Sequence, residues 1–198
     1  MQTYVASKNP GKIGELRTIL AGSLLEIDTY EDYVEVAEDR PSYIGNALLK
    51  ARALSEQLER AGIEAAVLAD DSGLEVDVLG GRPGVMSARY GGKSKTWPQR
   101  RAALLGELNA LPEDQRLARF ICAMVLILPH EEPLTSLGIV EGRIVAKERG
   151  KSGFGYDPVF LYPLKGCTFG ELSSEEKNAV SHRRRAAEGM LALLRGRA

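Results

Sequence analysis

Residues 67–92, VLADDSGLEVDVLGGRPGVMSARYGG, form the stretch around which the rest of the chain is interpreted. An apolar run, 66–69, leads into the adjacent carboxylates Asp70 and Asp71 and then into Ser72 and a glycine. The run predicts a buried strand, and a carboxylate at its end is typical of a cation site or a general base. Successive side chains of an extended segment point to opposite faces, so we expect only one of the two acids to face a cleft. The alternative is an Asx-turn followed by a glycine-rich surface loop.

Composition indicates one globular domain, 1–198. Hydrophobic residues make up 44 % of the chain and charged residues 27 %, which is enough apolar material for a core. The net charge of −1 creates no field toward nucleic acid or a membrane surface, so neither partner is expected. Cys122 and Cys167 have no metal-ligand spacing. With no signal-peptide pattern and no bilayer-length apolar run, we expect a cytoplasmic protein.

Strand and helix patterns alternate, which predicts an α/β fold with a mixed sheet and flanking helices. Two long neighbouring strands joined by a proline-containing turn are expected to pair antiparallel. Apolar runs predict strands at 3–6, 25–36, 65–69, 120–128, 134–149 and 157–160. Apolar periodicity and capping residues predict helices at 10–20, 42–61, 97–111 and 174–195.

The segment 7–12, SKNPGK, lies at a predicted strand-to-helix turn. Asn9 is a suitable N-cap and Pro10 a suitable first helical residue. Helix N-termini bind phosphate through their amide groups, and Lys8 and Lys12 add positive charge. The Walker A pattern is absent here, so the alternative is a capped helix with surface lysines.

A second group of candidates surrounds the start of the helix at 42–61. Glu38 precedes this helix and could join Asp71 on a cation. Asn46 and Lys50 are four residues apart and therefore share a face beside the apolar stripe. A lysine there could neutralise phosphate charge, although a solvated lysine is the common case.

Two later stretches suit recognition of a planar base. In 152–158, SGFGYDP, an aromatic residue between two glycines precedes a carboxylate, which suits stacking and edge recognition. In the helix predicted at 174–195, Ser181 and His182 would point about 100° apart, which argues against a catalytic pair and favours a base-edge donor. The alternatives are a tight turn with core aromatics and a basic turn of an amphipathic helix.

Five stretches in this order resemble the inosine triphosphate pyrophosphatases, the Ham1-like nucleotide hydrolases: SKNPGK, IGNALLKA, LADDSGLEVDVLGGRPGVMSARYGG, GFGYDPVF and ELSSEEKNAVSHR. The resemblance covers nearly the whole chain. It implies two lobes around a central active-site cleft, a homodimer, and Mg²⁺-dependent hydrolysis of ITP, dITP and XTP to the monophosphate and pyrophosphate. The alternatives are a Maf-like pyrophosphatase acting on pyrimidine or modified nucleotides and a nucleotide-binding regulatory module without turnover.

The resemblance also implies roles for individual residues. Asp71 would be the proton acceptor and a metal ligand, Glu38 a second metal ligand, and Lys50 a catalytic contact to the phosphates. Asp70 would be the structural partner of Asp71. The residues implied to hold the nucleotide are Ser7, Lys8, Asn9, Pro10, Gly11, Lys12, Ser72, Phe154, Gly155, Tyr156, Asp157, Lys177, His182 and Arg183. Gly45, Met86 and Arg184 depart from the family pattern, and two of them, Met86 and Arg184, leave the substrate preference open.

Overall fold

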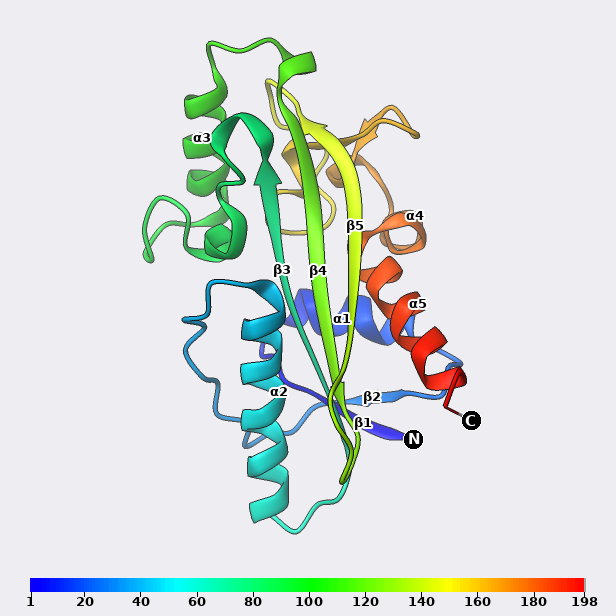
Figure 1. Cartoon of the computed structure of the whole chain (residues 1–198). Coiled ribbons are helices and arrows are strands. Elements are labelled where there is room, and N and C mark those ends of the chain that lie inside the picture. Colours follow the sequence, from blue (N-terminus) through cyan, green and yellow to red (C-terminus); the bar gives the residue numbers. More distant parts are fainter. Residues whose placement is uncertain (198) are drawn as a thin grey trace. The chain divides into compact units, whose positions relative to one another are not determined.

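The computed structural model describes residues 1–197 and contains a mixed seven-stranded sheet with flanking helices (Figure 1). The strand order is β2-β1-β3-β4-β5-β6-β7. β1 pairs in parallel with β2 and β3, whereas β6 pairs antiparallel with β5 and β7, which confirms the expected α/β class. The strands are β1 (Gln2–Val5), β2 (Glu26–Asp28), β3 (Ala66–Val76), β4 (Leu117–Ile127), β5 (Leu134–Ile144), β6 (Phe160–Tyr162) and β7 (Cys167–Thr168).

The α-helices are α1 (Pro10–Ile19), α2 (Tyr43–Arg60), α3 (Trp97–Leu108), α4 (Ser174–Val180) and α5 (His182–Arg195). Short 3₁₀ helices occupy Asp77–Leu79, Gly84–Arg89, Glu113–Gln115, Asp157–Val159 and Phe169–Glu171. Local sequence explains two of the helix starts. The Asn9 side chain accepts from the amides of Gly11 and Lys12, with Pro10 in the first turn of α1. The Ser42 side chain caps α2 by accepting from the amide of Gly45.

The chain forms two compact units. Unit 1 contains residues 1–71, 122–138 and 182 onward, and unit 2 contains 72–121 and 139–181. The chain therefore passes from one unit to the other within β3, β4 and β5, and again between α4 and α5. The single domain of two lobes around a cleft stays a prediction.

Unit 1 has a hydrophobic layer on each face of its strands. Leu68 of β3 packs in a cluster with residues of α1 and α5, whereas its neighbour Val67 packs in a second cluster with residues of α2. β4 alternates in the same way, with Met124 in the first cluster and Val125 in the second. Strand alternation thus places α1 and α5 on one face of the unit 1 strands and α2 on the other.

Unit 2 has its own core, which is rich in aromatic residues. The rings of Phe120 and Phe169 are stacked with their centroids 5.9 Å apart, and Phe160 lies 4.5 Å from Phe120. Leu104 and Leu108 of α3 belong to the same cluster. Tyr156 of the 152–158 segment belongs to this core, which therefore holds that segment in place.

Five expected element boundaries are wrong. The strand predicted at 25–36 is limited to Glu26–Asp28, and the strand predicted at 134–149 ends at Ile144. The strand predicted to end at residue 69 continues through Ser72 to Val76, so Asp70 and Asp71 lie within β3 rather than at its end. The strand predicted at 157–160 is a 3₁₀ helix followed by β6. The helix predicted at 174–195 is interrupted at Ser181, whose extended backbone (φ −70°, ψ 159°) separates α4 from α5. The predicted angle between Ser181 and His182 assumed one helix and therefore does not apply.

Gly138 in β5 tests how closely α5 approaches the sheet. A Cβ atom added at Gly138 would overlap the carbonyl oxygen of His182 and the amide nitrogen of Ala186. Because both obstacles are backbone atoms, we expect Gly138→Ala to lower the free energy of unfolding by about 2 kcal/mol or more. Gly106→Ala is the control, since a Cβ there meets nothing within 4 Å and helical alanine should stabilise by about 0.5–1 kcal/mol. Urea denaturation of both variants measures the difference; equal stability would contradict the close approach.

Candidate active site

Asp70 and Asp71 point to opposite faces of β3, as the alternation of an extended strand requires. Asp70 Oδ2 accepts from Arg183 Nη2 of α5 at 2.9 Å. Asp71 Oδ2 accepts from Asn46 Nδ2 of α2 at 3.0 Å. The structure therefore separates the two acids as the sequence predicts and gives each a different helix as its neighbour.

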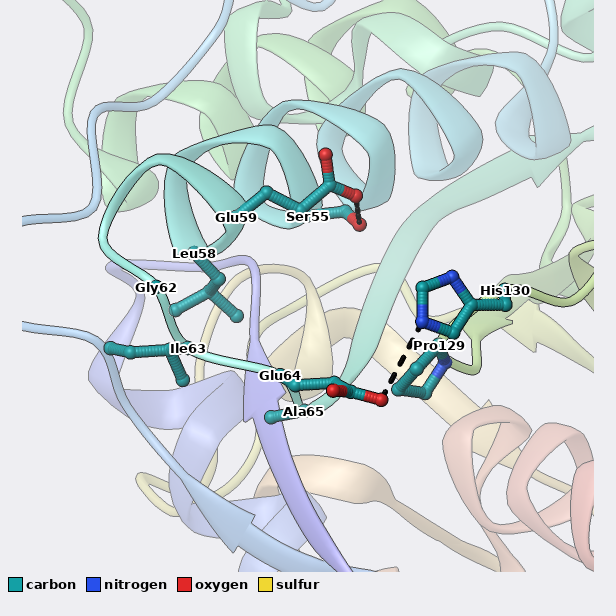
Figure 2. A pocket seen from close by; sticks show the side chains of 9 residues that line it. All are labelled: Ser55, Leu58, Glu59, Gly62, Ile63, Glu64, Ala65, Pro129 and His130. Carbon is teal, nitrogen blue, oxygen red and sulfur yellow. Dashed lines mark hydrogen bonds and ion pairs between the residues drawn. The ribbon is translucent and has the colours of Figure 1, made fainter.

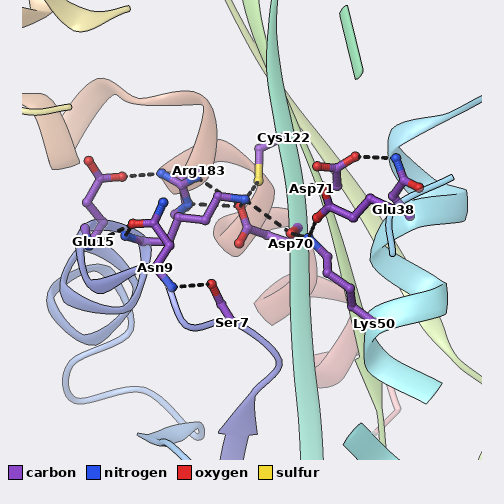
Figure 3. Close-up of polar contacts among 12 residues, drawn as sticks. Ser7, Asn9, Glu15, Glu38, Lys50, Asp70, Asp71, Cys122 and Arg183 are labelled. Carbon is purple, nitrogen blue, oxygen red and sulfur yellow. Dashed lines mark hydrogen bonds and ion pairs between the residues drawn. The ribbon is translucent and has the colours of Figure 1, made fainter. Parts of the chain in front are cut away.

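We name Lys12, Glu38, Lys50, Asp70 and Asp71 the acid–lysine cluster. Figure 3 labels four of its members, Glu38, Lys50, Asp70 and Asp71. Lys50 Nζ lies 2.6 Å from Glu38 Oε1 and donates at 2.6 Å to the backbone carbonyl of Asp70. Lys12 Nζ lies 3.2 Å from Asp70 Oδ2. All five residues belong to unit 1, and four were singled out from the sequence as catalytic, metal-binding or phosphate-binding.

The surroundings of the cluster shift the pKa values of its two aspartates in opposite directions. Burial raises the pKa of Asp71, which Lys50 opposes and Glu38 reinforces. Burial alone would also raise the pKa of Asp70, but the charges of Lys12 and Arg183 outweigh it and hold that pKa well below its usual range. Burial acts to lower the pKa of Lys50, and the surrounding carboxylates reverse this effect and raise it. Asp70 is thus a firmly ionised partner, whereas Asp71 is the acid whose proton affinity is increased.

Asp70 is also part of a buried ion pair that joins three elements. Arg183 is 1 % exposed, and its guanidinium donates to Asp70 of β3 and to Glu15 of α1. These charges outweigh the effect of burial and raise the pKa of Arg183. Cys122 is buried, and its Sγ lies 3.9 Å from Asp70 Oδ2. The pairing fixes the start of α5 against the strand that carries Asp71.

The segment 7–12 lies at the start of α1, as expected, but its amides already have acceptors. Those of Gly11 and Lys12 donate to the Asn9 side chain, and that of Asn9 donates to Ser7 Oγ. The amide of Lys8 donates to Glu35 Oε1 at 3.2 Å. A phosphate at this helix start would therefore compete with the chain's own acceptors, and the lysine side chains would supply the added attraction.

Three candidates for base recognition, Phe154, Asp157 and Lys177, lie in unit 2. Together with Phe169 we name them the aromatic–lysine cluster. Lys177 Nζ lies 2.5 Å from Asp157 Oδ2, and both side chains are almost completely buried. The same Lys177 Nζ lies 4.7 Å from the centroid of the Phe154 ring. Asp157 Oδ2 also accepts from the backbone amide of Phe154 at 2.7 Å, so one carboxylate contacts both the backbone that carries the Phe154 ring and the ammonium group of Lys177.

Two of the remaining candidates, Ser72 and His182, lie next to points where the chain changes unit. Ser72 follows Asp71 directly at one such point, and His182 follows Ser181 at another. Ser72 is half-buried, and His182 is 4 % exposed. Gly155 and Tyr156 are buried within the 152–158 segment.

Two residues of the site were not in the predicted set. Asn46 is fully buried and links the amide of Arg40 to Asp71; its four-residue spacing from Lys50 placed it on the same helix face, but no role was assigned to it from the sequence. Glu15 had no comparable signal, because its partner Arg183 lies 168 positions away. Local patterns do not report such a long-range pair.

The oxygen donors around Asp71 suit a small divalent cation. Within residues 1–197, no set of three or more histidine, cysteine or acidic side chains is arranged to hold a metal ion. Mg²⁺ is commonly bound by one or two carboxylates together with water and substrate phosphates. Glu38 and Asp71 supply two such carboxylates, and Glu38 contributes to the raised pKa of Asp71. A cation would relieve that repulsion, so these residues fit the metal-binding role expected of them.

A surface pocket of about 310 Å³ lies elsewhere in unit 1 (Figure 2). It is formed by the end of α2 and the turn after β4, with His130 Nε2 3.6 Å from Glu64 Oε1 at its rim. Its lining contains no member of the acid–lysine cluster. This pocket therefore lies apart from the candidate catalytic residues. In the described part of the chain, no helix has the length and apolar character needed to cross a membrane.

Comparison with known proteins identifies the family to which the whole chain is similar. The model of the Ham1 family matches residues 3–193. The chain is 45 % identical to a dITP/XTP pyrophosphatase of Photorhabdus laumondii, with 98 % of both chains covered. It is 44 % identical to a dITP/XTP pyrophosphatase of Geobacillus kaustophilus, covering 93 % of this chain and 90 % of that protein. Among solved structures, the Ham1 protein of Staphylococcus aureus matches with a TM-score of 0.85 and 34 % identity over 100 % of both chains.

Proposed function

Because the chain belongs to the Ham1 family, we propose that it hydrolyses non-canonical purine nucleoside triphosphates such as dITP and XTP. The products are the nucleoside monophosphate and pyrophosphate. In this reaction the oxygen of a water molecule bonds to the α-phosphorus. The bond between that phosphorus and the oxygen bridging the α- and β-phosphates breaks, and pyrophosphate leaves. The acid–lysine cluster carries this proposal, since it combines a buried carboxylate with lysines, the groups that water attack on a triphosphate needs.

Asp71 is the group proposed to accept the proton of the attacking water. Its raised pKa makes the carboxylate a stronger base than an exposed aspartate. Asn46 donates to one oxygen of Asp71 and orients the carboxylate. Asp70 cannot take this role as readily, because its lowered pKa makes it a weak base.

The lysines and the 7–12 segment are proposed to bind the phosphates. Lys12 and Lys50 both contact Asp70, so a single strand residue places two ammonium groups. The triphosphate oxygens would compete for these two ammonium groups with their present partners, Asp70 and Glu38. Lys8 is exposed and adds charge to the same segment.

Glu38 and Asp71 are proposed to hold Mg²⁺. When bound, the cation supplies positive charge that offsets the charge on the triphosphate as the leaving group departs. The charge of Lys50, 2.6 Å from Glu38, already partly neutralises this pair of acids.

The aromatic–lysine cluster and the start of α5 are proposed to recognise the base. Phe154 offers a ring for stacking, and Lys177 lies at 4.7 Å from that ring, where its ammonium group can donate to a 6-oxo oxygen. A 6-amino group would leave this donor without an acceptor, which is how a site with fixed polar groups rejects the wrong substrate. We assign Arg183 the task of fixing the start of α5 beside His182, since its guanidinium is already paired.

Two further properties are proposed from family membership. The protein would act as a homodimer, and it would act in the cytoplasm, where nucleotide pools are used. Both follow from the resemblance of the whole chain to Ham1 proteins. Sedimentation analysis of the purified chain tests the first.

The activity is tested by measuring pyrophosphate release from ITP, dITP, XTP, ATP and dTTP, each with and without Mg²⁺. We expect kcat/KM for ITP, dITP and XTP to exceed that for ATP and dTTP by about 100-fold or more. Little pyrophosphate should form without the cation. A preference for dTTP or UTP would instead indicate a Maf-like enzyme, and binding without pyrophosphate release would indicate a regulatory module.

A further inference from the structure

One end of α3 contacts the loop that carries Phe154, and all of these residues belong to unit 2. Arg101 Nη1 donates to the carbonyl oxygen of Gly155 at 2.9 Å. The Trp97 ring meets the Tyr156 ring edge-on, with centroids 5.5 Å apart and planes at 79°. Two side chains one helical turn apart on α3 thus support two consecutive loop residues.

The backbone at Gly155 favours glycine, and the Trp97 ring packs beside it. Gly155 has φ +64°, a backbone conformation that residues with a side chain rarely adopt, and a Cβ there would be in ordinary van der Waals contact with the Trp97 ring at 3.7 Å. The Arg101 side chain is only 12 % exposed and lies 3.0 Å from Glu148 Oε1 through its Nε. Arg101 is therefore held in place before it donates to the loop, which makes it a fixed support.

Contacts of Asp157 hold the other end of this loop. Asp157 accepts from the Phe154 amide and pairs with Lys177. Tyr156 is anchored by its hydroxyl, which donates to the carbonyl of Ser87 at 3.1 Å. The backbone between Phe154 and Asp157 is consequently fixed at both ends, and α3 supplies the support for the middle.

We propose that Trp97 and Arg101 are positioning residues that determine base selectivity by setting where the Phe154 ring and the Lys177 ammonium group stand. The proposal rests on the proposed function, in which these two groups recognise the purine. Discrimination between a 6-oxo and a 6-amino base, or against a 2-amino group, depends on polar groups placed to within a fraction of an ångström. Neither Trp97 nor Arg101 belongs to the acid–lysine cluster, so the chemical step is not expected to depend on them.

The test compares dITP with dGTP, which differ by a 2-amino group, in Arg101→Met and Trp97→Ala. For each variant we expect KM for dITP to rise about tenfold and the dITP-to-dGTP ratio of kcat/KM to fall about tenfold. The value of kcat for dITP should stay within about twofold of wild type. Arg101→Lys and Trp97→Phe keep a donor and a ring respectively, and should recover much of the ratio.

Arg119→Met is the matched control for loss of an arginine ion pair in unit 2, because Arg119 pairs with Asp77 and Glu75, which lie outside the loop that carries Phe154. Its selectivity ratio should equal that of wild type. If Arg101→Met or Trp97→Ala does not fold, Arg101→Gln and Trp97→Phe replace them, with an expected ratio change of about threefold.

Trp97 also gives a direct readout of binding, because it is the only tryptophan in the sequence. Addition of dITP without a divalent cation should change its emission, and Arg101→Met should require about tenfold more nucleotide for the same change. If the variants hydrolyse dITP with an unchanged dITP-to-dGTP ratio, the positioning role of Trp97 and Arg101 is overturned, while the proposed function still stands. A wild-type chain that hydrolyses neither dITP nor XTP would overturn the proposed function, a distinct result.

Discussion

Asp71→Asn is expected to lower kcat for dITP about 10³-fold, while the protein stays folded. Asparagine has nearly the shape of aspartate but cannot accept the proton of the attacking water. The raised pKa of Asp71 shows that folding disfavours its ionised form, since burial is the largest cause. Removing the charge should therefore increase the free energy of unfolding at neutral pH, so that activity and stability change in opposite directions. Pyrophosphate release and urea denaturation measure the two effects.

Asp28→Asn is the control for this substitution. Asp28 is an exposed acid of unit 1 whose distance from Arg17 is 4.0 Å, so its replacement should change neither property appreciably. A kcat above about one tenth of wild type in Asp71→Asn would show that another group accepts the proton. A large loss of stability in the same variant would contradict the sign of the pKa shift.

Arg183→Met is expected to lower the free energy of unfolding by about 3–5 kcal/mol. Methionine fills much of the same volume, but it leaves the carboxylates of Asp70 and Glu15 without the guanidinium that neutralises them. Asp70 is fully buried, so its charge cannot be compensated by water. Adding Asp70→Asn to Arg183→Met should recover part of the loss, since the uncompensated charge is then removed.

Arg119→Met serves again as the control, because the partly exposed pairs of Arg119 should contribute only about 0–1 kcal/mol. The pH dependence gives an independent check. The folded-state pKa of Asp70 is lowered from 3.8, so its ionisation stabilises the fold fully above that value and the contribution is lost as pH falls through the folded pKa. The stability difference between wild type and Arg183→Met should thus be constant down to about pH 5 and shrink below about pH 4. A constant difference at all pH values would contradict the role of Asp70.

Local signals in the sequence were sufficient for the elements that they directly specify. Asn9 caps α1 as predicted, and Ser42, where the second helix was predicted to begin, caps α2, because capping depends on residues two or three positions apart. The alternation of Asp70 and Asp71 was also predictable, since it follows from strand geometry alone.

Elements whose form depends on tertiary contacts were not predictable in the same way. The residues Ser72-Gly73 are typical of a turn, yet pairing within the sheet keeps them in β3. The break at Ser181 has no proline or glycine to mark it, although serine with an extended backbone is a usual residue before a helix start.

In the candidate site, too, residues within sequence motifs were predictable, whereas contacts between distant segments were not. The acid–lysine cluster was largely predictable because most of its members lie within recognisable motifs of the sequence. The role of Asp70 as the partner of Lys12, Lys50 and Arg183 needed the structure, since these residues come from three different helices. The support that α3 gives to Gly155 was likewise invisible, because Arg101 and Gly155 are 54 positions apart.

The interleaved connectivity of the two units has a consequence for fragments of this protein. Each unit is assembled from separate segments, and unit 1 requires residues from both ends of the chain. A product that stops at Ser181 would lack α5 and with it Arg183, leaving Asp70 buried without its main partner. No single cut therefore releases either unit intact, and a split version would regain activity only if its two pieces reassociate.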